Sequence, residues 1–448
     1  MTTTKSVGIL VGGGPAPGIN SVIAAAFIYC HEQGVDMVGI QDGYRWIMRG
    51  DISHVRHPTI DGVSRIHFRG GSYLGVSRDN PTTNPDYLEK TITSLLRLNV
   101  DKLISIGGDD TAFSAKKLVA KAEGRIRVVH VPKTIDNDLN LPTGINTFGF
   151  QTARHHGVEI VKNLMEDALT TTRWYFVITM GRKAGHLALG IGKATGATIT
   201  IIPEEFHDRN PLTIHKLVDV LAGAIIKRLA HGRQHGVAVI AEGLVEAMTH
   251  ADLKELQDVE RDAHGNIRIA EINFGEILKK LVQARLAEFK IRTTIVAKNI
   301  GYELRCVDPV PADMEYCRDL GYFAAKYILE GGNGAIASIQ NGEFIPIPFE
   351  AVVDVTTGRP KIRMVNIDTG NYESARMYMI RLTHEDFDNP HELANYAATA
   401  GIGLDEFEKQ FKYLVEHDFT PRSIPRQTGA PHRPPTPTTT PRPKRKTP

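Results

Sequence analysis

Short apolar runs that end at glycine or proline alternate along this chain with helix-length amphipathic stretches. Val7–Val11 is followed by three glycines and then by a helical pattern from Asn20 to about His31. Lys102–Ile106 is followed in the same way by the helical composition of Ala112–Ala122. The other predicted strands are Val35–Ile40, Val128–Val131, Trp174–Thr179, Thr198–Ile202, Val237–Ala241 and Thr293–Val296. Such strand–loop–helix repetition predicts parallel sheets with helices on both faces.

Composition narrows the class of protein. The chain has 448 residues, 42% of them hydrophobic, which suits two domains with buried cores. It contains no apolar run of the roughly 20 residues that a membrane-spanning helix needs, so we expect no membrane partner. Its three cysteines, Cys30, Cys306 and Cys317, lack the spacing of a zinc site. Few cysteines in a chain of this length favour a reducing, cytoplasmic location.

The formal charge of +2 hides an uneven distribution. Residues 419–448 carry seven basic side chains and no acidic ones, which leaves 46 basic against 51 acidic residues in the rest. Nine prolines and no apolar periodicity predict that this tail is disordered. It has no aromatic residues spaced between the cations for base stacking. We therefore favour a solubilising extension over a nucleic-acid-binding arm.

Glycine-rich loops follow two of the predicted strands. In Gly12–Asn20, glycines would let the backbone approach a phosphate, and the next helix would direct its N-terminus at that phosphate. No Gly-Lys-Ser/Thr follows, so this is not a Walker A loop, and a tight turn without ligand is the alternative. In Gly107–Thr111, Asp109 is placed to hold Mg²⁺ on phosphate oxygens. The alternative there is Asp110 or Thr111 as a helix N-cap.

The segment Pro132–Asp138 combines a lysine, a hydroxyl and two carboxylates at the end of a strand. Phosphoryl transfer to an alcohol requires a base for the hydroxyl proton, a cation for the developing charge and a metal clamp. This segment supplies the first two requirements. Because loops at the carboxyl ends of parallel strands share one edge of the sheet, all three segments are expected to meet.

The order of these motifs resembles the phosphofructokinase family, over residues 7–245 and, more divergently, past 325. The resemblance implies that family's fold: two Rossmann-like three-layer α/β/α domains, here with the disordered C-terminal tail. The motifs are GGxxPGxN, GGSxLGxSR (Gly70–Arg78), GGDD, PKTIDND, GFxTA (Gly149–Ala153), MGR (180–182), PEE (203–205), AEG (241–243) and Gly301–Arg305.

The resemblance also implies a role for each matching residue. Asp136 resembles the base for the sugar 1-hydroxyl, Asp109 the Mg²⁺ ligand and Asp138 its acidic partner. The other catalytic candidates are Lys133 and Asp110. The donor-phosphate candidates are Gly13, Gly14, Arg78, Gly108 and Thr111. The sugar-phosphate candidates are Thr134, Ile135, Arg173, Met180, Gly181, Arg182, Glu242, Tyr302 and Arg305.

Asp110 and Lys133 bear on the phosphoryl donor. Members that use ATP generally have glycine at both positions, whereas this pair is typical of members that use pyrophosphate. An Asp110 carboxylate would repel the ATP α-phosphate, and Lys133 could neutralise pyrophosphate. We therefore expect Mg²⁺-dependent transfer from pyrophosphate to fructose 6-phosphate. The alternatives are an ATP-dependent phosphofructokinase, a sedoheptulose-7-phosphate kinase, which Tyr302 leaves open, and a non-catalytic sugar-phosphate-binding regulator.

The resemblance implies a domain division and an assembly. Residues 1–147, completed by 308–360, would form the donor domain. Residues 148–307, completed by 361–418, would form the sugar-phosphate domain. Arg173 falls where the family has an arginine that reaches the neighbouring subunit's sugar phosphate, so we expect a homodimer or homotetramer with shared active sites.

Overall fold

The computed structural model describes residues 5–206, 210–248, 273–352 and 361–416. The predicted tail, 419–448, lies outside the described residues. Within these ranges two large sheets form, each with helices on both faces, and two short strands pair as a third sheet. The predicted three-layer α/β/α architecture is confirmed. No helix in the described ranges is long and apolar enough to cross a membrane.

The first sheet has seven strands in the order β13-β10-β5-β4-β1-β2-β3. The five inner strands are mutually parallel, and the two edge strands, β13 and β3, are antiparallel to their neighbours. The strands are β1 (Ser6–Val11), β2 (Met37–Ile40), β3 (Val55–Arg56), β4 (Val100–Gly107), β5 (Arg127–Pro132), β10 (Ala335–Ile336) and β13 (Ile347–Pro348).

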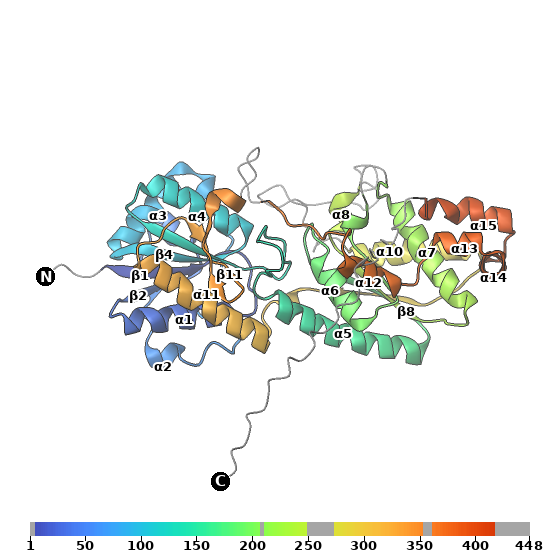
Figure 1. Ribbon diagram of the computed structural model, residues 1–448, viewed down its shortest axis with the longest axis horizontal. Coiled ribbons are helices and arrows are strands. Elements are labelled where there is room, and N and C mark those ends of the chain that lie inside the picture. Colours follow the sequence, from blue (N-terminus) through green and yellow to red (C-terminus); the bar gives the residue numbers. More distant parts are fainter. Residues whose placement is uncertain (1–4, 207–209, 249–272, 353–360, 417–448) are drawn as a thin grey trace, which may run out of the picture. The chain divides into compact units, whose positions relative to one another are not determined.

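Four helices cover this sheet. The apolar sides of α3 (Pro85–Arg97) and α4 (Asp109–Ala122) share one cluster with inward-facing strand residues such as Leu10 and Leu103. On the opposite side, α1 (Ile19–Glu32) and α11 (Pro311–Leu329) lie side by side (Figure 1). The chain therefore returns to its first sheet after completing the second.

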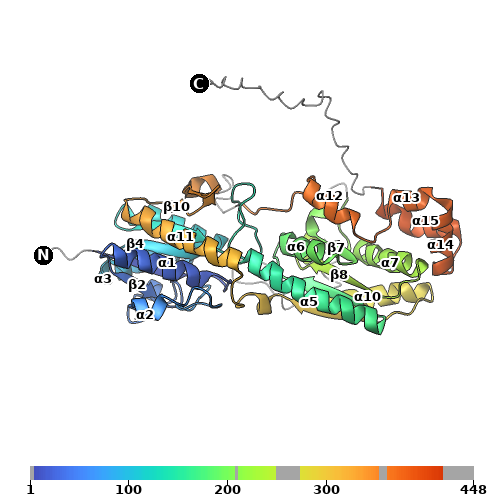
Figure 2. The ribbon, with the colours of Figure 1, turned by 60° about the horizontal axis from the view of Figure 1, so that its bottom comes forward.

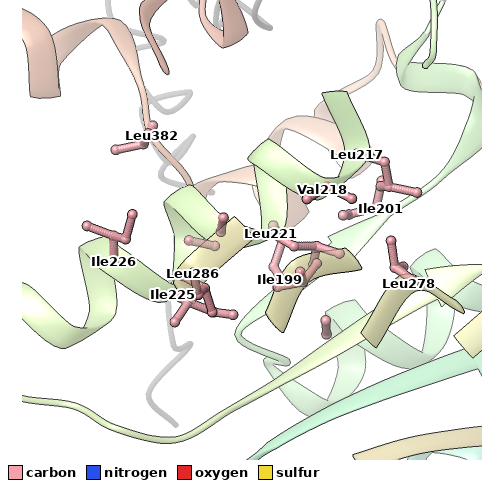
Figure 3. Packing of buried hydrophobic residues seen from close by; sticks show 14 of the residues in the cluster. Ile199, Ile201, Leu217, Val218, Leu221, Ile225, Ile226, Leu278, Leu286 and Leu382 are labelled. Atoms are coloured by element: carbon pink, nitrogen blue, oxygen red, sulfur yellow. The ribbon is translucent and has the colours of Figure 1, made fainter. Parts of the chain in front are cut away.

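The second sheet has four parallel strands in the order β7-β8-β6-β9. They are β6 (Trp174–Thr179), β7 (Ile199–Ile201), β8 (Gly236–Ala241) and β9 (Ile295–Ile300). Alternate strand residues, such as Ile199 and Ile201, pack with α7 (Ile214–Ala230) and α10 (Phe274–Glu288), as Figure 3 shows. On the other face lie α5 (Phe150–Thr171) and α6 (His186–Thr195), with α5 running along the sheet in Figure 2.

C-terminal helices extend the second core, where Phe407 and Phe411 join the cluster around α7. These helices are α13 (His384–Asp388), α14 (Pro390–Ala400) and α15 (Leu404–Phe411), and they follow α12 (Gly370–Met377). The remaining short elements are α2 (Ile60–Val63), α8 (Leu244–Ala247), β11 (Ile339–Gln340), β12 (Glu343–Phe344), and the 3-10 turns η1 (Ile47–Arg49), η2 (Pro81–Thr83), η3 (Pro203–Glu205), η5 (Tyr302–Leu304), η6 (Phe349–Val352) and η7 (Lys412–Leu414).

One predicted strand is misplaced. The prediction Thr293–Val296 begins two residues early and stops four residues short of the end of β9. Because β9 lies at an edge of the sheet, its residues Lys298 and Asn299 are exposed. Their polarity ended the apolar pattern on which the prediction depended.

The sheet order places the candidate loops together. β5, β4 and β1 are adjacent, so the loops that leave their carboxyl ends share one edge. β1 has β2 on one side and β4 on the other, which makes the gap between β1 and β4 a topological switch point, where α/β sheets bind ligands. In the second sheet, the carboxyl end of β6 lies between those of β8 and β9.

Candidate active site

The glycine loop after β1 is shaped by Thr111. A Cβ at Gly12 or at Gly107 would overlap the Thr111 side chain, so the two strand ends can approach the first turn of α4 only because both positions are glycine. Thr111, a donor-phosphate candidate, is itself buried beneath the loop. Gly108 is the N-cap of α4, and neither Asp110 nor Thr111 caps this helix.

Cationic side chains gather at this loop. Lys133 Nζ donates a hydrogen bond to the Gly14 carbonyl, and Arg305 Nε lies 3.5 Å from the Pro15 carbonyl. A Cβ at Gly14 would overlap the Arg305 guanidinium, so glycine is required for this approach. Burial and then the positive charge of Arg305 lower the pKa of Lys133 to about 8. Burial and then the charge of Arg78 lower the pKa of Arg305. Cations that repel one another beside a helix N-terminus are typical of a site that binds a polyanion.

Buried carboxylates face these cations. Asp136 Oδ1 is buried and has no hydrogen-bond partner within the described part of the chain. Burial raises the pKa of Asp136, and the positive charge of Arg182 most strongly opposes that rise. Burial, followed by repulsion from Asp136 and Asp109, raises the pKa of Asp138 to about 7. A buried carboxylate with a free oxygen suits a general base.

Arg182 joins the carboxyl end of β6 to these carboxylates. Its Nη1 lies 2.9 Å from Asp109 Oδ1 and 4.0 Å from Asp138 Oδ2. The charge of Asp109 raises the pKa of Arg182. Arg182 has a left-handed backbone with φ of 50°, and Glu242 Oε1 holds this turn by accepting from the backbone N–H groups of Gly181 (3.0 Å) and Arg182 (2.9 Å). Burial raises the pKa of Glu242 to about 7.

The smaller candidates hold the surrounding backbone. Thr134 Oγ1 accepts a hydrogen bond of 3.0 Å from the Asp136 N–H, and Ile135 between them is buried. The Met180 N–H donates to the Ile300 carbonyl at 3.0 Å. These contacts fix the loops after β5 and β6, which carry the carboxylates and Arg182.

One sugar-phosphate candidate, Arg173, lies away from this cluster, and another, Tyr302, lies at its exposed edge. Arg173 precedes β6 whereas Met180 follows it, and a six-residue strand spans about 20 Å. Arg173 Nε instead lies 3.9 Å from Asp167 Oδ2. Tyr302 is 64% exposed, with the Arg305 guanidinium 5.4 Å from its ring centroid.

The carboxylates of Asp109, Asp136 and Asp138 suit Mg²⁺ better than a metal ion whose ligands all come from protein side chains. No group of three or more His, Cys, Asp or Glu side chains in the described ranges could hold a metal ion. Mg²⁺ commonly uses one or two carboxylates, water and substrate phosphates. Asp109 is a half-buried carboxylate in the repulsive acidic group with Asp136 and Asp138, so an added cation would relieve the repulsion.

Sequence reasoning missed two residues beside the site. Glu204 lies in the PEE motif, but it was given no role. Its Oε1 accepts from the N–H groups of Gly185 (2.9 Å) and Val365 (2.8 Å). Arg363 contacts the loop that carries Asp136, from more than 200 residues away. A lone arginine without a motif around it offered no sequence signal.

The fold and the site define an α/β protein in which a glycine loop and clustered cations face buried carboxylates at a switch point. The family model of phosphofructokinase matches residues 6–328. The chain belongs to the phosphofructokinase family.

Curated relatives match nearly the whole chain. Pyrophosphate--fructose 6-phosphate 1-phosphotransferase of Thermotoga maritima is 48% identical over 417 residues, covering 92% of this chain and 99% of that protein. The protein of the same name from Naegleria fowleri is 45% identical over 427 residues, covering 93% and 98%.

Solved structures agree on the fold. A pyrophosphate-dependent phosphofructokinase from Nitrosospira multiformis is similar with a TM-score of 0.63 and 16% identity, over 89% of this chain and 92% of that one. Phosphofructokinase from Saccharomyces cerevisiae gives a TM-score of 0.60 at 20% identity, over 92% of this chain and 50% of that one.

Proposed function

We propose that this chain transfers a phosphoryl group reversibly from pyrophosphate to the 1-hydroxyl of fructose 6-phosphate, giving fructose 1,6-bisphosphate. The names of the two relatives at 48% and 45% identity support this reaction. Pyrophosphate and the sugar phosphate ester are closer to each other in their free energies of hydrolysis than ATP and that ester are. Both directions should therefore be measurable.

The positions of Lys133 and Asp110 support pyrophosphate, and not ATP, as the phosphoryl donor. Lys133 is buried, and its ammonium group already contacts the glycine loop, where it can neutralise a compact polyanion. Asp110 is exposed in the first turn of α4, and its negative charge is among those that raise the pKa of Arg182. A carboxylate at this position disfavours the longer, charged chain of ATP.

The remaining residues suggest the chemical steps. Asp136 takes the proton of the sugar 1-hydroxyl, because its Oδ1 is buried and lacks a partner among the described residues. Lys133 and Arg182 stabilise the charge of the phosphoryl group in transfer. Thr134 and Glu242 keep the Asp136 and Arg182 backbones in place. Asp109 would hold Mg²⁺, which supplies charge neutralisation on pyrophosphate when bound.

The distant position of Arg173 supports a shared active site. Since Arg173 lies at the opposite end of β6 from Met180, it can serve a sugar-phosphate site most simply in a neighbouring copy of the chain. We therefore include a homodimer or homotetramer in the proposal. A cytoplasmic location is also included, supported by three free thiols.

An activity matrix tests the proposal. Pyrophosphate and ATP are each combined with fructose 6-phosphate and sedoheptulose 7-phosphate, with and without Mg²⁺, and the reverse reaction is run with fructose 1,6-bisphosphate and phosphate. We expect the highest kcat/KM for pyrophosphate with fructose 6-phosphate, only with Mg²⁺. Activity with ATP but not pyrophosphate would overturn the donor. Sugar-phosphate binding without turnover would identify a regulator.

A further inference from the structure

Arg363 lies against the loop that carries the candidate base. Its Nε and Nη2 donate to the Asn137 carbonyl at 3.1 and 3.0 Å, and Nη1 donates to the Ile145 carbonyl at 2.6 Å. Nη2 also donates to Asn137 Oδ1. The Arg363 backbone N–H donates to the Asp138 carbonyl at 2.7 Å. One residue thus contacts the backbone on the C-terminal side of Asp136 through both its side chain and its main chain.

Asn137 is the residue that most needs this support. It is buried and has a left-handed backbone with φ of 58°, a conformation that costs free energy for a residue with a side chain. Its side-chain oxygen also accepts from the Thr147 N–H at 3.0 Å, and its Nδ2 donates to Asn146 Oδ1 at 2.9 Å. Asn137 separates Asp136 from Asp138, so its backbone angles decide where both carboxylates lie.

The segment around Arg363 is itself fixed at the site. Leu139 and Ile362 form an antiparallel bridge. His186 Nε2 lies 3.0 Å from the Arg363 carbonyl, and the Val365 N–H donates to Glu204 Oε1 at 2.8 Å. Arg363 is therefore held on both sides of its own Cα, and it can transmit this rigidity to the loop.

We propose that Arg363 is a positioning residue for phosphoryl transfer, which holds Asn137 in its left-handed conformation and so fixes the Asp136 carboxylate for proton abstraction. Arg363 acts through the loop, because its hydrogen-bond donors are directed to Asn137 and Ile145. The planar fork of Arg363 makes four donor contacts from three nitrogens, whereas an ammonium group has three donors on a single nitrogen.

The expected kinetic signature separates positioning from binding. Misplacement of a reacting group by about 1 Å can reduce the rate by about 10²-fold. Arg363→Met should therefore lower kcat by about 10²-fold, while the KM values for pyrophosphate and fructose 6-phosphate stay within about threefold. Arg363→Lys should recover part of kcat. Lys361→Met, an exposed cation two residues away, is the matched control and should keep full activity.

Chemical rescue distinguishes positioning from a general loss of folding. Millimolar guanidinium, far below denaturing concentrations, should raise the kcat of Arg363→Ala in a saturable way and should not raise that of Lys361→Met. Circular dichroism and the unfolding midpoint are recorded for each variant. A kcat of Arg363→Met within threefold of the unmodified protein would overturn the inference. The inference would also be overturned if the loss of activity matched the fraction of unfolded protein, or if only KM changed.

This inference rests on the proposed reaction, and the two can fail separately. If the unmodified protein lacks pyrophosphate-dependent activity, the proposed function fails. If the unmodified protein is active and Arg363→Ala keeps that activity or gains nothing from guanidinium, only the positioning role fails.

Discussion

Replacing Lys133 by methionine tests the electrostatics of phosphoryl transfer most directly. Methionine keeps most of the unbranched side chain and removes its charge, together with the hydrogen bond to the Gly14 carbonyl. Lys133 is 4% exposed, so water screens that charge weakly. At an effective dielectric constant of about 20, a unit charge about 4 Å from the transferring group contributes about 4 kcal/mol. At 1.36 kcal/mol for each tenfold change, Lys133→Met should lower kcat with pyrophosphate by about 10³-fold.

Steady-state rates in both directions measure this effect. Because the equilibrium constant of the reaction is unchanged, rates at subsaturating substrates should fall by the same factor forward and in reverse. Lys162→Met is the control, since Lys162 is exposed and pairs with Glu159 at 2.7 Å on α5. A folded Lys133→Met protein that keeps kcat within about tenfold of the unmodified one would refute the reasoning.

Three further changes probe donor choice and stability. Asp110→Gly should lower activity with pyrophosphate and raise the ratio of kcat/KM for ATP over pyrophosphate at least about tenfold, because a repelling carboxylate is removed. Asp313→Ala should lower the free energy of urea unfolding by about 3 kcal/mol, because Asp313 accepts from Gly149 N (3.1 Å), Thr152 N (2.7 Å) and Thr152 Oγ1 (2.6 Å) at the start of α5. Burial lowers the pKa of His130 to about 3. Below the ordinary histidine pKa of about 6.5, only the unfolded chain therefore binds a proton at this residue. Lowering the pH from 7 to 5 should cost about 2 kcal/mol of stability, and His130→Gln should abolish this loss.

Each of these has a control. The donor ratio of Asp110→Gly is compared with that of Asp319→Asn, an exposed carboxylate on α11, which should not change it. The same Asp319 variant should unfold like the unmodified protein. An Asp313→Ala protein that does likewise would disprove the stabilising role of Asp313 at the start of α5. For His130, the free energy of unfolding is measured across the pH series for the unmodified and variant proteins. A difference between them that stays constant from pH 7 to 5 would contradict the burial argument.

The local elements of this fold could be predicted because their patterns are short-range. Val7–Val11 and Trp174–Thr179 are continuous apolar runs, as buried parallel strands require. The glycines after β1 and β4 marked loops where a backbone must approach something closely. The last four residues of β9 were missed because an edge strand exposes polar residues such as Lys298.

The sequence by itself therefore determined the α/β class, the strand ends that carry chemistry, and the candidate residues within each motif. Only the tertiary structure decided that Thr111 packs beneath the glycine loop, that Arg182 reaches Asp109 from the second sheet, and that Arg363 supports Asn137. These contacts join residues tens to hundreds of positions apart. Their partners are set by strand order and by the return of the chain, and no local periodicity encodes either.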